Sequence, residues 1–155
     1  MEGEPMSTRP AVVFGDVHGE SHLLEMLIKK VRDRFGDEVD LYSTGDIIDR
    51  GPDSKGVIDI CIREGVQAIL GNHELWFHQL CAQGVFQEMA LHHAMKGDMT
   101  LLSYGVTNFS SRMPSAIAED ALAAIPQEHK DYILSLPVTR KFECGGTTYR
   151  LIHAG

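Results

Sequence analysis

The chain has 155 residues, of which 43% are hydrophobic and 23% charged, as is ordinary for a single soluble globular domain. Its formal net charge of −8 argues against a nucleic-acid-binding surface, because phosphate backbones are bound by clustered Lys and Arg. No apolar run reaches the length of about 18 residues that suggests a membrane span.

The start of the chain and its cysteines bear on processing and compartment. Residues 1–10 are polar, contain proline and lack the apolar core of a secretory signal, so we expect a flexible tail before one domain at 11–155. The three cysteines, Cys61, Cys81 and Cys144, fit neither a disulfide framework nor a zinc ribbon. We therefore expect reduced thiols in a cytoplasmic protein.

Short apolar runs alternate with amphipathic segments in the first half of the chain. The apolar runs at 11–14, 41–44 and 66–70 each lead into glycine and predict buried strands. Apolar residues at helical spacing predict helices at 20–35 and 55–63, the second capped by Asp53 or Ser54. Strands separated by helices become parallel neighbours, so the predicted class is α/β, with helices covering a sheet.

The second half of the chain has a different pattern. The mostly helical stretch from 74 to 135 is rich in Met, Ala and His, and predicts a helical insertion (about 75–135) over one end of the sheet. Two strand-like runs at 139–143 and 147–152 flank Gly145–Gly146 and predict a β-hairpin. The second run leads directly into His153.

Polar residues of the kind that bind metals follow the three glycines that end the first strands. The blocks are Gly15-Asp16-Val17-His18-Gly19, Gly45-Asp46-Ile47-Ile48-Asp49-Arg50-Gly51 and Gly71-Asn72-His73-Glu74, with His153 after a fourth strand. Ligands in α/β sheets lie beyond the carboxyl ends of the strands, so we expect these side chains to meet at one edge. Carboxylates mixed with imidazoles suit Mn²⁺, Fe or Zn²⁺, and a central carboxylate can bridge two metals about 3.5–4 Å apart.

Each block taken alone has a plainer interpretation. Asp16 alone predicts a helix N-cap, His153 a packed histidine, and Arg50 an ion pair with a neighbouring aspartate. Three blocks in order, each directly after an apolar strand, favour a metal site instead. We expect the remaining histidines to be packed or solvated rather than ligands; they are His22, His78, His92, His93 and His129.

The blocks resemble the signatures Gly-Asp-x-His-Gly, Gly-Asp-x-x-Asp-Arg-Gly and Gly-Asn-His-Glu of the phosphoprotein phosphatase branch of the calcineurin-like metallophosphoesterases. The resemblance covers 11–155 and extends to the bacterial and phage-type serine/threonine phosphatases and the symmetrical dinucleoside tetraphosphatases. It implies a layered β-sheet sandwich flanked by helices.

The resemblance also implies a role for each matching residue. It assigns five residues to two divalent metal ions, Mn²⁺ first and Fe, Zn²⁺ or Ni²⁺ as alternatives: Asp16 and His18 on one ion, Asp46 bridging, and Asn72 and His153 on the other. His73, oriented by Asp49, corresponds to the general acid, and Arg50 to a clamp on the substrate phosphate. In such a mechanism a hydroxide between the metals attacks phosphorus directly.

Three functions follow as hypotheses. The first is a serine/threonine-type phosphoprotein phosphatase acting on a phosphorylated protein or peptide, or on another small phosphomonoester. The second is a symmetrical bis(5'-nucleosyl)-tetraphosphatase. The third is a catalytically impaired metal-binding module. None of the three involves a nucleic acid or membrane partner.

The third hypothesis rests on a departure from the family pattern. That pattern continues beyond the His-Ala-Gly block, with a further strand that brings another histidine ligand and with a second phosphate-binding arginine. We therefore expect an incomplete family member without the C-terminal strands, in which the second metal is bound more weakly. An exposed sheet edge would then favour a homo-oligomer.

Overall fold

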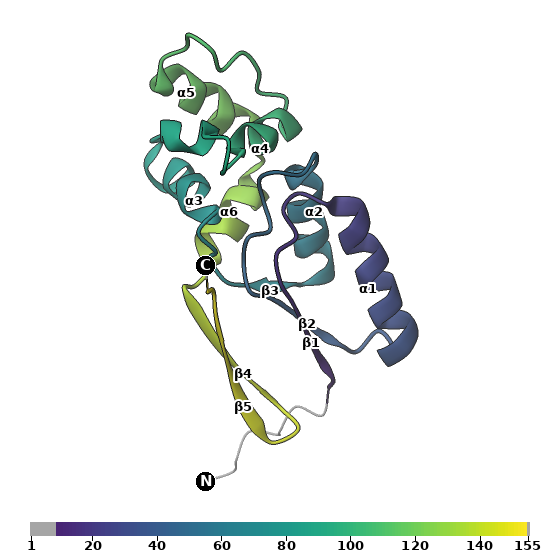
Figure 1. Ribbon diagram of the computed structural model, residues 1–155. Coiled ribbons are helices and arrows are strands. Elements are labelled where there is room, and N and C mark those ends of the chain that lie inside the picture. Colours follow the sequence, from purple (N-terminus) through teal and green to yellow (C-terminus); the bar gives the residue numbers. More distant parts are fainter. Residues whose placement is uncertain (1–8, 155) are drawn as a thin grey trace.

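The computed structural model describes residues 9–154, so the expected tail, apart from Arg9 and Pro10, lies outside the described residues. The elements in chain order are β1 (Ala11–Phe14), α1 (Ser21–Phe35), β2 (Asp40–Ser43), α2 (Ser54–Glu64), β3 (Gln67–Ala68), α3 (Glu74–Gln83), the 3-10 helix η1 (Glu88–Leu91), α4 (Gly97–Ser103), α5 (Pro114–Ala124), α6 (Gln127–Ser135), β4 (Thr139–Cys144) and β5 (Thr147–Ile152). This α/β order confirms the predicted class (Figure 1). Among the described helices, none is both long and apolar enough to cross a membrane.

The first three strands form a parallel sheet in the order β1-β2-β3. The run predicted as a strand at 66–70 contributes only two residues to β3. The backbone N–H of Ile69 still donates to the Ser43 carbonyl of β2. The N–H of Leu70 donates instead to the carbonyl of Pro137, which lies outside the sheet. The extended run therefore leaves the ladder at the point where the site begins.

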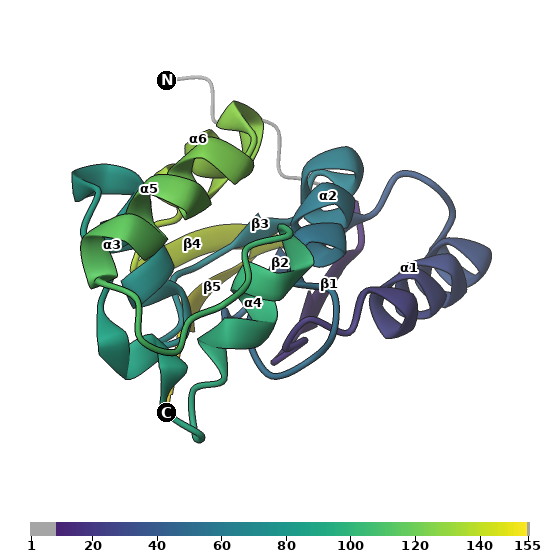
Figure 2. The ribbon, with the colours of Figure 1, turned by 90° about the horizontal axis from the view of Figure 1, so that it is seen from above.

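Side chains of this sheet alternate between two apolar layers. Leu41 and Ala68 face the helices and pack in one core with residues of α1 and α2, such as Leu24 and Val57. Tyr42, on the opposite face, belongs to a smaller core with the hairpin β4–β5. The strands β1–β3 thus lie between α1 and the hairpin, as the predicted sandwich requires (Figure 2).

The hairpin forms where the sequence predicts it. β4 and β5 pair antiparallel from Thr139↔Ile152 to Cys144↔Thr147. Gly145 and Gly146 make the turn with φ of 57° and 79°, a left-handed conformation that hairpin turns of this length require. The second strand therefore runs back toward the sheet and delivers His153 to the carboxyl end of β2, where its ring contacts Thr44.

Helices α3 to α6 form the predicted helical insertion, and α3, α4 and α5 gather at the end of the molecule opposite the hairpin turn (Figure 1). Their buried faces extend the main core, with Trp76, Phe77 and Leu101 all nearly inaccessible to solvent. His129 is fully buried between two partners, the Tyr104 hydroxyl at 2.8 Å and Asp59 Oδ1 at 2.8 Å. Both of its ring nitrogens are satisfied, as expected for a packed histidine.

Candidate active site

Tight turns after the strands bring the polar blocks together. Gly45 has a φ of 95°, and a Cβ there would lie 2.5 Å from the backbone nitrogen of Gly71. The turns after β2 and β3 therefore pack backbone against backbone, which only glycine allows. Four other site residues adopt positive φ, between 46° and 69°, a conformation that is uncommon outside glycine and concentrates at functional sites: His18, Asp46, Asp49 and Arg50.

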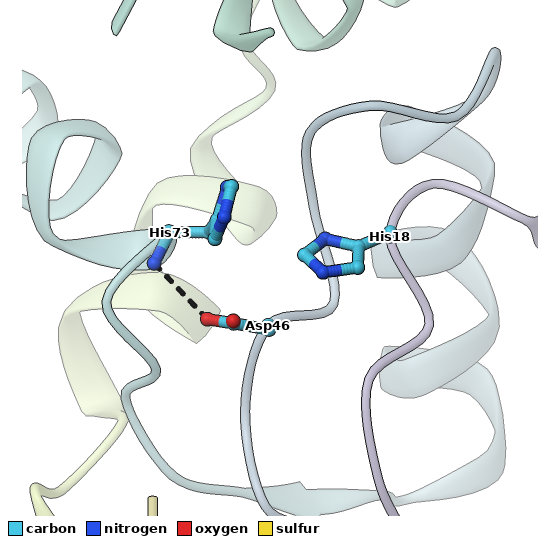
Figure 3. Close-up of side chains that lie close together, drawn as sticks. All are labelled: His18, Asp46 and His73. Atoms are coloured by element: carbon cyan, nitrogen blue, oxygen red, sulfur yellow. Dashed lines mark hydrogen bonds between the residues drawn. The ribbon is translucent and has the colours of Figure 1, made fainter. Parts of the chain in front are cut away.

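Asp46 lies at the centre of the cluster. It is 5% exposed, and its Oδ1 accepts a hydrogen bond from the backbone N–H of His73 at 3.0 Å. Its carboxylate is shared by two groups of ligand-type atoms, each within 4.8 Å of one another: one with His18 and His73, the other with Asp16 and His153. Figure 3 shows the imidazoles of His18 and His73 flanking this carboxylate. The Asp46 carboxylate is therefore common to both groups of ligand-type atoms.

Backbone carbonyls fix which nitrogen each histidine presents. His18 Nδ1 lies 3.0 Å from the Ile48 carbonyl oxygen, and His153 Nδ1 lies 2.8 Å from that of Thr44. A carbonyl only accepts, so each Nδ1 must carry a proton, and Nε2 is the nitrogen that each ring presents to the cluster. A hydrogen bond of this kind is the usual support of a metal-binding histidine.

The atoms that face each Nε2 are themselves acceptors or cations. His153 Nε2 lies 2.9 Å from Asn72 Oδ1 and 3.4 Å from Asp46 Oδ2. His18 Nε2 lies 3.7 Å from an oxygen of Asp16 and 3.0 Å from Nη1 of Arg50, which donates to it. Acceptors facing one another call for a positive charge between them, so the residues fit divalent cations. A metal at His18 would replace the hydrogen bond from the guanidinium.

His73 and Asp49 form a buried pair beside the cluster. His73 Nδ1 donates to Asp49 Oδ2 at 2.9 Å, and the side chains are 3% and 0% exposed. This hydrogen bond raises the pKa of His73 above its ordinary value; the charges of Asp49 and Asp46 act in the same direction, while burial opposes them. The protonated ring is therefore favoured where it can serve as an acid.

Glu74 links the turn after β2 to the turn after β3. Its fully buried carboxylate accepts four backbone N–H groups, those of Asp46, Ile47 and Gly71 at 2.8 Å and that of Ile48 at 3.3 Å. Burial raises the pKa of Glu74 to about 7, against the opposite effect of these hydrogen bonds. These hydrogen bonds hold the Asp46 turn in place.

The plainer interpretations of Asp16 and Arg50 find no support in the geometry. Asp16 does not cap α1, which begins after Glu20. Within residues 9–154, Arg50 has no ion pair with Asp49 or Asp53: Asp49 pairs with His73, and the Asp53 carboxylate accepts from Ser21 and from the backbone N–H of Gly56. Its Nε donates instead to the Ala94 carbonyl at 3.3 Å, and its backbone N–H to that of Lys96 at 3.2 Å. The guanidinium therefore lies between the insertion and the cluster.

Three residues at the site were not predicted from the sequence. Trp76 is buried in the core, and its indole N–H donates to Asp49 Oδ2 at 3.0 Å. Thr100 Oγ1 contacts Asp49 Oδ1 at 2.7 Å, and Ser54 Oγ contacts Thr100 Oγ1 at 2.8 Å. No spacing rule signals these contacts, because they depend on how α3 and α4 pack.

The sequence model of the calcineurin-like phosphoesterase family matches residues 9–141. The chain belongs to that family. It is 31% identical to serine/threonine-protein phosphatase 1 of Salmonella typhimurium over 97% of the chain and 61% of that protein. It is 30% identical to a symmetrical bis(5'-nucleosyl)-tetraphosphatase of an Acidovorax species over 91% of the chain and 42% of that protein. The chain thus spans about half the length of these relatives.

Solved structures show the same calcineurin-like phosphoesterase fold. A crystal structure assigned as a candidate diadenosine tetraphosphatase superposes with a TM-score of 0.63 at 24% identity, over 98% of this chain and 53% of that one. A metallophosphoesterase from Sphaerobacter thermophilus gives a TM-score of 0.50 at 18% identity, over 86% of this chain and 44% of that one. At these identities the likeness establishes the fold.

Proposed function

We propose that the chain is a metal-dependent phosphoesterase that hydrolyses phosphomonoesters, with phosphorylated serine or threonine as its substrate class. The observation that carries the proposal is the position of Asp46, whose carboxylate is shared by two groups of ligand-type atoms at the ends of four strands. Membership of the calcineurin-like phosphoesterase family supports the same reaction class.

Two divalent ions, Mn²⁺ first, are the proposed cofactors. Asp16, His18, Asp46, Asn72 and His153 would hold them, and Asp46 belongs to both groups of ligand-type atoms. Such ions lower the pKa of water and neutralise charge on phosphoryl oxygens. They also reverse the local field of a cluster rich in carboxylates, so that an anionic substrate is attracted to a chain with a net charge of −8.

The protein's own groups act on the substrate. The Arg50 guanidinium, held at the cluster by the Ala94 carbonyl, would bind phosphoryl oxygens through its fork of N–H donors. His73, whose Nδ1 is committed to Asp49, would donate its Nε2 proton to the departing oxygen as the ester P–O bond breaks. The products are an alcohol and phosphate, and water supplies the remaining atoms.

The positions of the aromatic and basic residues favour a phosphomonoester over a dinucleoside tetraphosphate. The single tryptophan is 1% exposed and bound to Asp49, so its ring does not offer a platform for a base. Of the three basic residues of the insertion, Arg112 binds Asp120 and Lys130 binds the Leu122 carbonyl. That leaves Lys96 of the insertion, whose backbone carbonyl accepts from the N–H of Arg50. A polyphosphate would call for more cationic contacts than Arg50 and Lys96 provide.

Parallel assays on two substrates test this choice. The chain is incubated with Mn²⁺ and either a phosphothreonine peptide or diadenosine tetraphosphate, and the release of phosphate or of adenosine diphosphate is followed. Turnover of the peptide at a higher kcat/KM supports the proposal. Preferential hydrolysis of diadenosine tetraphosphate would instead assign the function of the tetraphosphatase relatives.

A further inference from the structure

Thr100 connects the helical insertion to the His73–Asp49 pair. It lies on α4, is fully buried, and its Oγ1 contacts Asp49 twice, at 2.7 Å to Oδ1 and at 2.9 Å to the backbone nitrogen. The backbone nitrogen must donate, and the carboxylate must accept. The Thr100 hydroxyl therefore donates its proton to Oδ1 and accepts from the N–H of the same aspartate.

Ser54 completes the hydrogen bonding of this hydroxyl. Its Oγ lies 2.8 Å from Thr100 Oγ1 and 3.0 Å from the backbone nitrogen of Asp49. The single proton of Thr100 is committed to the carboxylate, so Ser54 is the donor between the two hydroxyls. Every hydrogen-bonding capacity of the Thr100 hydroxyl is thus used on Asp49 or on Ser54 of α2, and a fully satisfied buried network of this kind is rigid.

Trp76 fixes the other oxygen of the same carboxylate. Its indole N–H donates to Asp49 Oδ2 at 3.0 Å, and His73 Nδ1 lies 2.9 Å from that oxygen. Thr100 on α4 and Trp76 on α3 therefore hold the two carboxylate oxygens from two helices of the insertion. The direction in which Asp49 meets the imidazole is set by this pair of donors.

We propose that Thr100 and Trp76 are positioning residues, which aim the proton of His73 at the leaving oxygen by fixing the Asp49 carboxylate. This inference rests on the proposed phosphoesterase function. The two residues touch Asp49 and act through it. The insertion thereby contributes to the proton transfer as well as covering the end of the sheet.

The consequence depends on the leaving group. A poor leaving group needs the proton of His73 as the P–O bond breaks, whereas a good one departs with much less help. General acids contribute about 10²–10⁴-fold where protonation is needed, so a misaimed proton should slow poor leaving groups selectively. Damage to the fold or to substrate binding would slow all substrates alike.

The test compares phenyl phosphate with p-nitrophenyl phosphate, the better leaving group, in the presence of Mn²⁺. Thr100→Val removes the hydroxyl at nearly constant shape, Thr100→Ser keeps it, and Trp76→Phe removes the indole N–H. Thr107→Val, at an exposed threonine of the insertion, is the matched control. We expect Thr100→Val and Trp76→Phe to lower kcat about tenfold more on phenyl phosphate than on p-nitrophenyl phosphate. Thr100→Ser and Thr107→Val should retain the wild-type ratio.

A second readout needs no turnover. The chain has one tryptophan, so its indole N–H gives a single nuclear magnetic resonance signal. In the metal-free protein, Thr100→Val should shift this signal and speed its exchange with water, because the carboxylate that holds the N–H has lost a donor. Thr107→Val should leave the signal unchanged.

The outcomes separate this inference from the function on which it rests. The positioning role would be overturned if Thr100→Val and Trp76→Phe lost kcat equally on both phosphates, or if Thr100→Ser did not keep the wild-type ratio. In either case, turnover by the wild-type protein would leave the phosphoesterase proposal intact. If the wild-type protein turns over neither phosphate, the proposed function fails. In that case, an unchanged Trp76 indole signal in Thr100→Val would also overturn the inference that Thr100 fixes the Asp49 carboxylate. Should the valine variant not fold, the same decision rests on Thr100→Ser and Trp76→Phe.

Discussion

At the scale of single residues, the glycines that precede Asp16 and Asn72 differ in what surrounds them. A Cβ on Gly71 would lie 2.1 Å from Asp46 Oδ1 and 2.4 Å from the backbone nitrogen of Asp46. A Cβ on Gly15 would meet nothing closer than Thr44 Oγ1, at 3.9 Å. The two positions carry the same residue in similar motifs, but only one of them needs it for space.

We therefore expect Gly71→Ala to displace Asp46 and Gly15→Ala to be tolerated. Overpacking should lower the free energy of unfolding of Gly71→Ala by about 1–3 kcal/mol, against at most about 0.5 kcal/mol for the control. Titration calorimetry with Mn²⁺ should also show weaker binding to Gly71→Ala. Equal stability and Mn²⁺ affinity in the two variants would contradict the packing described for this turn.

Glu74 provides a second test of the same turns. Glu74→Gln keeps the shape but places an amide donor among four backbone N–H groups, so at least one buried donor loses its acceptor. We expect urea unfolding to show a loss of about 1–3 kcal/mol. Glu88→Gln, at an exposed glutamate of η1, should change stability by less than about 0.5 kcal/mol. A loss no larger than that of the control would show that Glu74 does not hold the turns.

Whether a residue of the candidate site could be predicted from the sequence depends on how far along the chain its partners lie. The sequence could place Asp16, Asp46 and Asn72 at one edge of the sheet because each follows the glycine after a predicted strand. Trp76 and Thr100 could not be predicted, since they reach Asp49 across 27 and 51 residues of sequence through helix packing. Their side chains carry no local pattern that distinguishes a partner of Asp49 from an ordinary core residue.

At the scale of elements, an ion pair joins α1 to α2. Glu64, whose side chain is 17% exposed, accepts from Arg32 of α1, with Nε at 3.2 Å, and from Arg63 at 3.0 Å. These hydrogen bonds, the one from Arg32 first, lower the pKa of the Glu64 carboxyl. A lowered folded-state pKa contributes stability above the ordinary pKa of glutamate and loses it as pH falls through the folded value.

Glu64→Gln should therefore cost about 1 kcal/mol of unfolding free energy near neutral pH, and less as the pH is lowered. The difference from wild type should shrink between about pH 5 and pH 3 in denaturant titrations. Glu119→Gln, at an exposed position of α5, should show no comparable trend. A difference that is constant with pH would assign the effect to packing rather than to charge.

Elements were predictable where local signals and packing agree. The helices at 21–35 and 54–64 lie within a residue of their predicted bounds, and Asp53 caps the second by accepting from the backbone nitrogen of Gly56 at 2.9 Å. The strand at 66–70 was overextended because periodicity cannot show that Leu70 bonds to Pro137. Ser54, the other candidate cap, serves the Asp49 network instead.

At the scale of the whole molecule, one side of the sheet is open. Among residues 9–154, β1 pairs only with β2 and is the end strand of its sheet. Val13 of β1 is 42% exposed, and Leu23 and Leu27 of α1, on the helix side of the sheet, are 58% and 38% exposed. Exposed apolar side chains near unpaired strand groups favour association with a second copy.

We expect this chain to associate as its concentration rises, as measured by size-exclusion chromatography with light scattering. Val13→Lys should raise the monomer fraction, because a charge on an edge strand opposes pairing. Met113→Lys, at a methionine that is 71% exposed at the start of α5, should leave the fraction unchanged. A wild-type chain that stays monomeric at all concentrations would rule out this surface as an interface.

The layered architecture itself could be predicted, since alternating strands and helices admit few arrangements. What the sequence could not supply is how the insertion meets the site, because Arg50 and Asp49 contact Ala94, Lys96 and Thr100 through tertiary packing. The polar blocks thus locate the site, and the insertion completes it.

The most direct test of the account is hydrolysis of p-nitrophenyl phosphate by this chain with and without Mn²⁺, measured alongside Mn²⁺ binding. An Asp46→Asn variant serves as the control, because Asp46 is the ligand-type residue shared by both groups. The account predicts turnover that depends on Mn²⁺ and is abolished, together with most of the binding, by the substitution. Folded, Mn²⁺-loaded wild-type protein without turnover would contradict the proposed function and identify a metal-binding module instead.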